Sequence, residues 1–464
     1  MSAESTAAQA GLGATLYRST RGGGAAVPFE AALLRGPAED GGLYVPVDLP
    51  ALPAGWSEAT SMAELAERVL PPFMGLDGAR AVAGGLDFPV PLVRLGQDFV
   101  LELFHGPTAA FKDVGARSLA RLMQLALERS GGSATILVAT SGDTGSAVAD
   151  AFAGLGRIQV ALLYPKGGVS RVQENQLITA RPGLRSFAVR GTFDDCQRMV
   201  KEAFADPALA PLELTSANSI NVGRLLPQML YYLWGAKLAR EALGADAPLS
   251  VVVPSGNLGN LTAGVMANRM GLTGLKFVAA HNRNDYFARY LAGRAEAYEF
   301  APSVTTLSNA MDVGAPSNFE RLHALLGDSL RDQVQGEAVD DAATLARMRL
   351  THERFGYLAC PHTAVGLEAW ARLTGQEGGG GKGGAEAGGT EDGGTATGGA
   401  ATGMILATAH PAKFPEAVME ATGVKPETPA SLAAFEAAPK RVEEVDATLA
   451  DLRTALLDRP DFSA

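Results

Sequence analysis

The sequence predicts an α/β protein with two open, doubly wound sheets and an N-terminal mixed α/β domain. Short apolar, β-branched runs alternate with longer segments in which apolar residues recur every three or four positions. That alternation is typical of parallel strands joined by crossover helices. Two of the apolar runs are followed by glycine-rich loops that lead into helical segments. The 464 residues exceed the roughly 100–200 residues of one domain, so two or three cores can form.

Five apolar runs are predicted to be buried strands. They are TILVAT (135–140), QVALLYP (159–165), LRSFAVRG (184–191), LSVVVP (249–254) and LKFVAA (275–280). Helical periodicity predicts covering helices over residues 119–129, 146–156, 193–206 and 225–243. In such folds ligands bind beyond the carboxyl ends of the strands, so the loops after these strands are the first candidates for a site.

We expect three parts along the chain: an N-terminal domain over residues 1–94, a catalytic region of two α/β subdomains over 95–414, and a C-terminal helical segment over 415–464. Residues 375–403 hold 14 of the 55 glycines and no aromatic residue, so burial cannot repay the entropy of ordering them. Because a strand-like run follows, this stretch is predicted to be a flexible surface insertion within a folded unit.

Composition excludes several classes of function. Asp and Glu number 50 against 39 Lys and Arg, which gives a net charge of -11. The chain therefore has no overall electrostatic attraction for nucleic acid or for an anionic membrane. An anionic ligand must be held by local donors. No run approaches the ~18–20 apolar residues of a membrane span, and the first residues lack a signal pattern, so we expect a cytoplasmic protein. Cys196 and Cys360 lack metal or redox spacing and are expected to be core thiols.

Two glycine-rich loops share a strand–loop–helix arrangement. Residues 255–260, Ser-Gly-Asn-Leu-Gly-Asn, follow one predicted strand, and residues 141–145, Ser-Gly-Asp-Thr-Gly, follow another. A glycine-rich turn that opens a helix directs backbone N–H groups at an anion, so each loop is a candidate phosphate cradle. Neither loop matches the motifs of nucleoside triphosphatases or dinucleotide-binding folds. Glycines after strands also make simple turns, so the pattern alone leaves both interpretations open.

A third feature is the segment HGPTAAFKD, residues 105–113. Thr108 is predicted to cap the helix that follows, which places Lys112 at or just before its first turn. The helix dipole and a desolvated crevice both disfavour an ammonium group there, and a Schiff-base lysine requires such a lowered pKa. An exposed lysine is the commoner outcome of this pattern, so periodicity alone does not assign the residue.

Three segments resemble, in order and spacing, the lysine, substrate-carboxylate and phosphate loops of the threonine synthase family. They are HGPTAAFKD (105–113), TSGDTG (140–145) and VPSGNLGNLTAG (253–264). The longer form of that family is also resembled by YRSTRG (17–22), EDGGLYVP (39–46), NSINVGRLLPQ (218–228) and ATAHPAKF (407–414). Related dehydratases and sulfhydrylases lack YRSTRG and NSINVGR in this context. The resemblance covers most of the chain and implies fold type II of the pyridoxal-phosphate enzymes, that of the tryptophan synthase β subunit.

The resemblance implies a site for pyridoxal 5'-phosphate. Lys112 is implied to bind the cofactor as a Schiff base, and Thr408 to bond the pyridine nitrogen through a neutral hydroxyl. The phosphate loop is implied to consist of Gly256, Asn257, Leu258, Gly259 and Asn260. Leu258 stands where many relatives have phenylalanine, a change that leaves a backbone N–H contact intact. The glycine-rich insertion precedes the strand that carries Thr408, so a disturbance of that strand would put the ring contact in doubt.

The implied reaction converts O-phospho-L-homoserine and water to L-threonine and phosphate by γ-elimination and β-addition, the last step of threonine biosynthesis. Lys112 is implied to move protons during the reaction. The implied substrate-binding turn consists of Ser141, Asp143 and Thr144. The substrate phosphate requires cations, and Arg224 and Arg117 are the candidates, with a structural ion pair as the alternative for each. The small-molecule substrate is the expected partner, and the expected unit is a monomer or homodimer.

The six histidines point to no metal site. His105 and His410 adjoin implied site residues and are expected to line the cleft. The others show no metal-ligand spacing and are expected to be packed or solvated: His281, His323, His352 and His362.

Two alternative functions remain open. A β-eliminating threonine or serine dehydratase would use the same cofactor but release ammonia and a keto acid. A noncatalytic protein that binds a phosphorylated ligand could retain the fold, although the presence of Lys112 argues against it.

Overall fold

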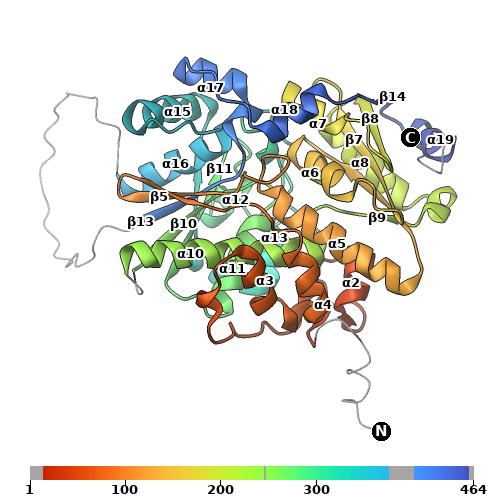
Figure 1. Cartoon of the computed structure of the whole chain (residues 1–464), viewed down its shortest axis with the longest axis horizontal. Coiled ribbons are helices and arrows are strands. Elements are labelled where there is room, and N and C mark those ends of the chain that lie inside the picture. Colours follow the sequence, from red (N-terminus) through yellow and green to blue (C-terminus); the bar gives the residue numbers. More distant parts are fainter. Residues whose placement is uncertain (1–13, 245–246, 376–401, 459–464) are drawn as a thin grey trace, which may run out of the picture.

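The structure is a computed structural model that describes residues 14–244, 247–375 and 402–458 (Figure 1). In these ranges the chain forms two large sheets and one small sheet, with helices packed against them. The prediction of an α/β fold with two open sheets is therefore confirmed. Most of the predicted glycine-rich insertion, residues 376–401, lies outside the described residues.

The five-stranded sheet is parallel throughout and has the order β14-β8-β7-β6-β9. Its strands are β6 (Ala134–Ala139), β7 (Ile158–Pro165), β8 (Leu184–Arg190), β9 (Leu214–Thr215) and β14 (Glu443–Asp446). Three of them, β6 to β8, match the predicted strands to within one residue. Continuous apolar runs mark strands that are buried on both faces, which explains this agreement.

The six-stranded sheet has the order β12-β11-β10-β13-β5-β4. Its strands are β4 (Leu92–Leu95), β5 (Asp98–Glu102), β10 (Leu249–Pro254), β11 (Leu275–His281), β12 (Val334–Ala338) and β13 (Thr402–Ala407). All neighbours are parallel except β4 and β5, which form an antiparallel hairpin at one edge. The carboxyl ends of β10 and β13 therefore lie side by side, and each is followed by a predicted site segment.

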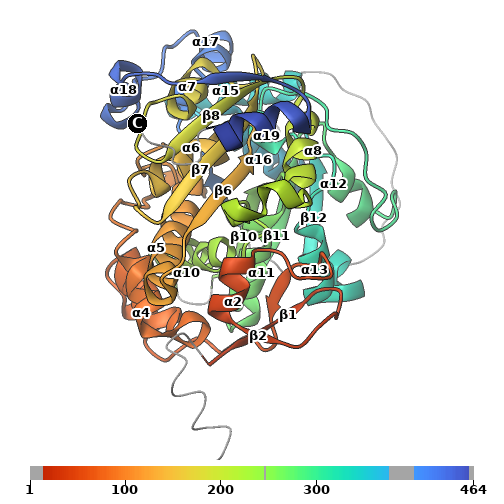
Figure 2. The ribbon, with the colours of Figure 1, turned by 90° about the vertical axis from the view of Figure 1, so that its right-hand side faces the viewer.

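The N-terminal residues form a small antiparallel sheet with the order β2-β1-β3 and three helices. Its elements are β1 (Leu16–Ser19), β2 (Val27–Pro28), α2 (Phe29–Arg35), β3 (Tyr44–Pro46), α3 (Met62–Val69) and α4 (Pro71–Ala83). Helix α3 starts where Ser61 accepts a hydrogen bond from the Glu64 N–H, and its buried residues recur at three- and four-residue spacing. Figure 2 shows β1, β2 and α2 at the opposite end of the molecule from α17 (Pro415–Thr422) and α18 (Ala430–Ala437).

Helices cover both large sheets. They are α5 (Lys112–Ser130), α6 (Asp143–Phe152), α7 (Arg171–Leu177), α8 (Phe193–Phe204), α9 (Val222–Leu225), α10 (Met229–Leu243), α11 (Gly259–Arg269), α12 (Tyr286–Leu291), α13 (Phe319–Leu326), α14 (Leu330–Gln333), α15 (Asp341–Phe355) and α16 (Pro361–Thr374). Each predicted helix is present, but the one over 225–243 is interrupted by a 3-10 turn, η3 (Leu226–Gln228). Pro227 lacks a backbone N–H, so α10 begins only after it.

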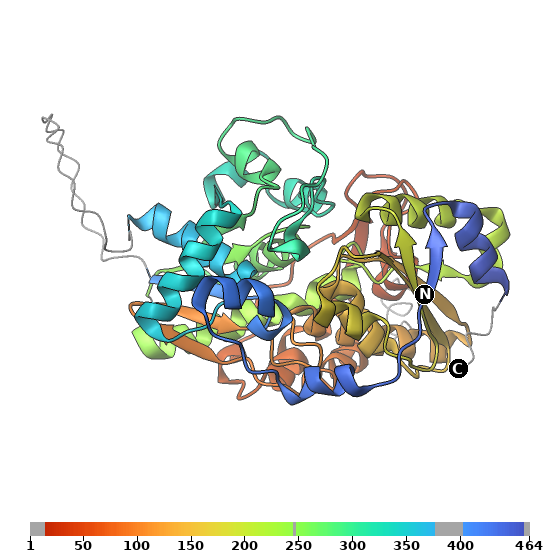
Figure 3. The ribbon, with the colours of Figure 1, turned by 90° about the horizontal axis from the view of Figure 1, so that it is seen from above.

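The C-terminal segment joins the two large sheets. It crosses from α17, beside the six-stranded sheet, to α19 (Leu449–Asp458), which packs on α8 beside the five-stranded sheet (Figure 3). The sequence predicted this segment to be helical, but it also contains β14, which pairs with β8. Only one residue of β14, Val445, is buried, so its sequence carries no strand pattern.

The start of α5 differs from the prediction. Helix α5 begins at Lys112 without a side-chain cap, so Thr108 is not its N-cap residue. The Thr108 backbone N–H and hydroxyl instead donate to the two oxygens of Asp113, at 2.9 and 2.7 Å. A turn with Ala109 at a φ of 55° separates Thr108 from the helix. The loop before α5 is thus held by a buried carboxylate on the helix itself.

Candidate active site

A cavity of about 780 Å³ lies at the carboxyl ends of β6, β10 and β13, where the two large sheets face each other. It is lined by ten of the twelve predicted site residues: Lys112, Ser141, Thr144, Arg224, Gly256, Asn257, Leu258, Gly259, Asn260 and Thr408. Asp143 and Arg117 do not line it. The structure therefore gathers segments that are up to about 300 residues apart in the sequence, at the place where open α/β folds bind ligands.

Backbone hydrogen bonds hold the lysine loop against the segment that carries Thr408. The Phe111 N–H donates to the Thr408 carbonyl at 2.8 Å, and the His410 N–H donates to the Ala109 carbonyl at 3.0 Å. Lys112 and Thr408 consequently face the same cavity. The Lys112 side chain is 12% exposed. Burial lowers its pKa to about 8; Asp143 opposes this shift, and the cations of Arg224 and Lys413 add to it.

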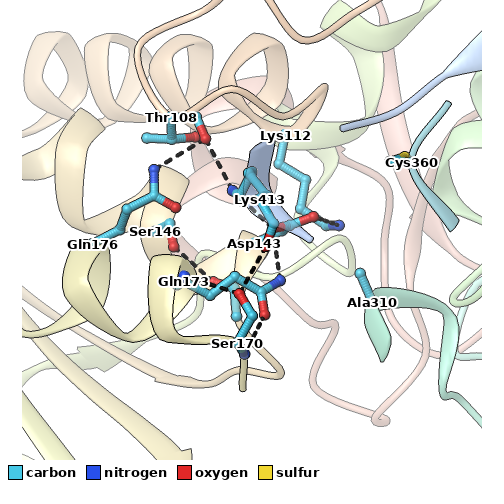
Figure 4. Close-up of polar contacts among 12 residues, drawn as sticks. Thr108, Lys112, Asp143, Ser146, Ser170, Gln173, Gln176, Ala310, Cys360 and Lys413 are labelled. Carbon is cyan, nitrogen blue, oxygen red and sulfur yellow. Dashed lines mark hydrogen bonds and ion pairs between the residues drawn. The ribbon is translucent and has the colours of Figure 1, made fainter. Parts of the chain in front are cut away.

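Asp143 lies behind Lys112 and pairs with two lysines (Figure 4). Its Oδ1 is 2.8 Å from Lys413 Nζ, and its Oδ2 is 3.8 Å from Lys112 Nζ. Gln173 Nε2 also donates to Oδ1, at 2.9 Å. Although burial raises the pKa of Asp143, the two ammonium groups hold it well below its usual range. The prediction that Asp143 binds substrate does not fit this placement, because Asp143 does not line the cavity and its Oδ1 is bonded to Lys413 and Gln173.

The loop between β10 and α11 has the properties of an anion site. Helix α11 starts at Gly259 without a side-chain cap, so its first N–H groups remain available to an anion. A Cβ on Gly256 would lie 2.9 Å from the Cα of Met311, so only glycine permits this close backbone approach. Leu258 adopts a left-handed φ of 61° just before the helix.

Asn260 supplies a further donor at this loop. Its Oδ1 accepts hydrogen bonds from the hydroxyls of Tyr231 and Tyr232, both at 2.7 Å. Its buried Nδ2 has no partner in the described part of the chain. A buried donor without a partner costs free energy, and an anionic oxygen in the cavity would satisfy it. The loop therefore fits a phosphate group.

Arg224 is a buried guanidinium on the wall of the same cavity. Its Nη1 donates to the Ala217 carbonyl at 2.6 Å, and within the described ranges it forms no ion pair with a carboxylate. Burial lowers its pKa to about 10, a value at which it remains charged at neutral pH. It packs on Gly115, where a Cβ would lie 2.8 Å from the Arg224 Cγ. An anion that enters the cavity can pair with this guanidinium.

Arg117 points away from the cavity. Its Nε donates to the Gly85 carbonyl at 2.8 Å, and its guanidinium lies 2.9 Å from Asp87 and 4.0 Å from Asp150. Arg117 lies five positions after Lys112, and at about 100° per residue this turns the side chain well off the Lys112 face of α5. The prediction of Arg117 as a phosphate ligand does not agree with this geometry.

The histidines are arranged differently from the expectation. His105 and His410 line a separate cavity of about 420 Å³, so the prediction that they line the Lys112 cleft is wrong. His362, at the start of α16, does line the Lys112 cavity. Its Nε2 accepts a hydrogen bond from the Ala310 N–H at 3.2 Å, and burial lowers its pKa to about 3, so the ring is neutral. No local motif marks His362, because only the fold brings α16 to the cavity.

Within the described ranges, no cluster of histidine, cysteine or acidic residues is arranged to bind a metal ion. No helix there is both long and apolar enough to cross a membrane. Both cysteines are free and buried, as expected of core thiols.

Comparison with known proteins defines the class. A family model described as pyridoxal-phosphate dependent enzyme matches residues 89–382. Models described as threonine synthase N terminus and threonine synthase, C-terminal, match residues 16–81 and 393–456. The fold is therefore that of a pyridoxal-phosphate-dependent lyase of fold type II, whose cofactor is pyridoxal 5'-phosphate.

Individual relatives narrow the class. The threonine synthase of Haemophilus influenzae is 38% identical over 448 residues, covering 93% of this chain and 97% of the relative. That of Escherichia coli is 37% identical over 450 residues, with the same coverage. The E. coli crystal structure aligns with a TM-score of 0.83 at 34% identity, over 96% of this chain and 100% of that one. The PLP-bound threonine synthase of Brucella melitensis aligns with a TM-score of 0.81 at 35% identity, over 96% and 99%. The chain belongs to the threonine synthase family.

Proposed function

We propose that this protein converts O-phospho-L-homoserine and water to L-threonine and phosphate, the last step of threonine biosynthesis. The observation that carries the proposal is the presence of two anion sites in the Lys112 cavity. One is the uncapped start of α11 with Asn260 Nδ2, which has no partner among the described residues, and the other is the buried Arg224 guanidinium. A phosphorylated cofactor and a phosphorylated substrate require two such sites. Relatives that are named threonine synthases support the same assignment.

The residues around the cavity divide into three proposed roles. Lys112 binds the carbonyl carbon of the cofactor, the loop 256–260 holds its phosphate, and Thr408 bonds its ring nitrogen. When bound, the cofactor withdraws electrons from the substrate, so that protons on its carbon chain become acidic. Ser141 and Thr144, at the start of α6, bind the substrate carboxylate with the helix N-terminus.

Lys112 and Arg224 are proposed to carry the reactive steps. Lys112 Nζ accepts a proton from the substrate α-carbon and returns protons along the chain, which its pKa of about 8 permits near neutral pH. Arg224 pairs with the substrate phosphate and stabilises the charge that develops as phosphate leaves from the γ-carbon. Water then adds at the β-carbon. His362 is neutral and is available as a hydrogen-bonding group on the same wall.

The active unit is proposed to be a monomer or homodimer in the cytoplasm. Two free, buried thiols are consistent with a reducing compartment.

The test follows phosphate and threonine together during incubation with O-phospho-L-homoserine. Equal amounts of both products are expected. The Arg224→Ala variant should lose roughly a hundredfold or more in kcat/KM, because a buried charge-assisted contact to the substrate is lost. Arg117→Ala is the matched control and should keep most of the activity, since Arg117 faces away from the cavity. Release of ammonia from serine or threonine, with no phosphate released from O-phospho-L-homoserine, would instead identify a dehydratase.

A further inference from the structure

Lys413 is a fully buried lysine that the proposed reaction does not use. It ends the 3-10 turn η6 (Pro411–Lys413), and its side chain is 0% exposed. Its Nζ donates to the Thr108 carbonyl at 2.9 Å and lies 2.8 Å from Asp143 Oδ1. Burial of an ammonium group is costly unless the charge is paired, so the contact with Asp143 is the feature that explains its presence.

The Asp143 carboxylate lies between two ammonium groups, and the contacts are unequal (Figure 4). Lys413 is hydrogen-bond close at 2.8 Å, whereas Lys112 stands off at 3.8 Å. Gln173 Nε2 donates a hydrogen bond to Asp143 Oδ1, the oxygen that also contacts Lys413. Gln173 is itself held in place, because its Oε1 accepts hydrogen bonds from the Ser170 N–H at 3.0 Å and from Asn309 Nδ2 at 2.9 Å. The carboxylate is therefore fixed from its Oδ1 side, while its other oxygen faces Lys112.

In this arrangement the negative charge of Asp143 is paired closely with Lys413 and only loosely with Lys112. Two ammonium groups around one carboxylate leave one excess positive charge, and Arg224 adds another on the cavity side of Lys112. Lys112, which has the longer contact, can give up its proton because the carboxylate stays paired with Lys413 through the shorter contact. Lys112 can thus be neutral without leaving an unpaired buried charge.

We propose that Lys413 is a positioning residue that anchors the Asp143 carboxylate by an ion pair, so that this carboxylate stays paired when Lys112 is neutral. The inference rests on the proposed role of Lys112 as the cofactor-binding lysine. The Lys413 carbonyl also accepts a hydrogen bond from the Ser170 hydroxyl at 2.9 Å, which ties η6 to the start of α7. Lys413 thereby links the segment that carries Thr408 to α6, through Asp143, and to α7, through Ser170.

The test uses cofactor-free protein and measures the rate of pyridoxal-phosphate association as a function of pH, by visible absorbance. Only the neutral amine of Lys112 reacts with an aldehyde, so the rate rises as pH passes the Lys112 pKa. The charged and titratable groups that act on Lys112 are Asp143, Arg224, Lys413 and Cys360, and His362 interacts with both Asp143 and Lys112.

Two single variants should shift the pH midpoint in opposite directions. Lys413→Met removes a positive charge, so the midpoint should rise by about one unit and the rate at neutral pH should fall about tenfold. Asp143→Asn removes the negative charge that favours the ammonium form, so the midpoint should fall. The double variant should lie between them, near the wild-type value. Lys425→Met, at an exposed position after α17, is the control and should change nothing.

Several outcomes would overturn the proposal. A midpoint that stays constant or falls in Lys413→Met would show that Lys413 only fills space, and thermal unfolding of the same samples reports any loss of stability separately. If Lys413→Met does not fold, Asp143→Asn decides, since an unchanged midpoint in that variant contradicts the charge arrangement. Phosphate release by the wild-type enzyme tests the proposed function independently. Its absence alongside the predicted midpoint shifts would contradict the function and not the role of Lys413.

Discussion

Lys112 and Lys413 lie on opposite sides of one carboxylate, yet their surroundings assign them different chemistry. Lys112 lines the cavity, whereas Lys413 is sealed from it and donates to the Thr108 carbonyl. An aldehyde that enters the cavity can reach only the first of these amines. The selectivity of cofactor attachment therefore depends on which lysine the fold exposes to the cavity, since both are buried and both face Asp143.

Borohydride reduction of the cofactor-bound protein should place the pyridoxyl group on Lys112. Peptide mapping by mass spectrometry is the measurement, and a label on Lys413 would contradict the assignment. Lys112→Ala should retain part of its cofactor affinity through the loop 256–260, because the phosphate donors are untouched, but it should show no useful turnover.

The resemblance to the threonine synthase family placed Lys112, Thr408, Arg224 and the loop 256–260 in one site, and the structure brings all of them to one cavity. These residues lie in short sequence motifs that can be recognised without knowledge of the fold. His362 was missed as a cavity residue and Lys413 as the ion-pair partner of Asp143, because their environment arises from contacts between α16, η6 and α6 that no local pattern encodes. Arg117 is a different case, since helical periodicity alone places it off the Lys112 face of α5.

Glycine positions in the loops are tested most directly by adding a methyl group. In Gly256→Ala the new Cβ would lie 2.9 Å from the Met311 Cα and 3.2 Å from the Ala310 carbonyl oxygen. Backbone atoms cannot rotate away, so the loop must move. We expect a loss of stability of about 1–3 kcal/mol and weaker cofactor binding. Gly156→Ala is the control because its Cβ would meet nothing within 4 Å. Thermal unfolding and cofactor titration measure both effects, and equal behaviour of the two variants would contradict the prediction.

The five predicted strands lie in the interior of the two large sheets, whereas the edge strands β4, β9, β12 and β14 and the interior strand β5 were not predicted. β7 and β10 are continuous apolar runs, and their bounds match the predictions to within one residue. β14 has one buried residue, and its pairing with β8 is supported by the ion pair between Arg185 and Glu443 at 2.8 Å. Such a strand forms because it can pair with β8 at the edge of the sheet and because Glu443 can pair with the buried Arg185 guanidinium. Both features belong to the tertiary structure and not to the local sequence.

We propose that the chain works as three parts, with bounds near residues 1–94, 95–414 and 415–464, and that the last part stabilises the five-stranded sheet. Val445, Leu452 and Leu456 of this part pack in one apolar cluster with Cys196. The Cys196 thiol is fully buried, and burial raises its pKa to about 12, so it is unreactive in the intact protein.

Truncation after Lys440 should therefore expose Cys196 to a thiol reagent. The removed residues include β14 and α19, which cover this side of the sheet. Counting of reacted thiols in native buffer, with peptide mapping, is the measurement. Cys360 lies in the other half of the molecule and should stay protected, which shows that the remainder is folded. Protection of both thiols in the truncated chain would contradict the proposed role of the last part.

The position of Thr408 depends on contacts outside the glycine-rich stretch that precedes β13. Asp98 Oδ1 accepts hydrogen bonds from the Gly403 N–H at 2.7 Å and from Trp370 Nε1 at 3.0 Å. This carboxylate holds the start of β13 against the end of α16. β13 also pairs with β10 on one side and with β5 on the other, so the strand is fixed across its length.

Replacement of residues 376–401 by a linker of about six glycine and serine residues, which can span roughly 20 Å, should leave Thr408 in place. Loop length enters the closure entropy only logarithmically, so stability should change by about 1 kcal/mol or less. Cofactor affinity should match that of the full chain, measured by titration alongside thermal unfolding. Asp98→Ala in the full-length chain is the contrasting variant, because it removes both hydrogen bonds that join α16 to β13 and should weaken cofactor binding. If the linker variant loses its cofactor while Asp98→Ala keeps it, the glycine-rich stretch itself must position Thr408.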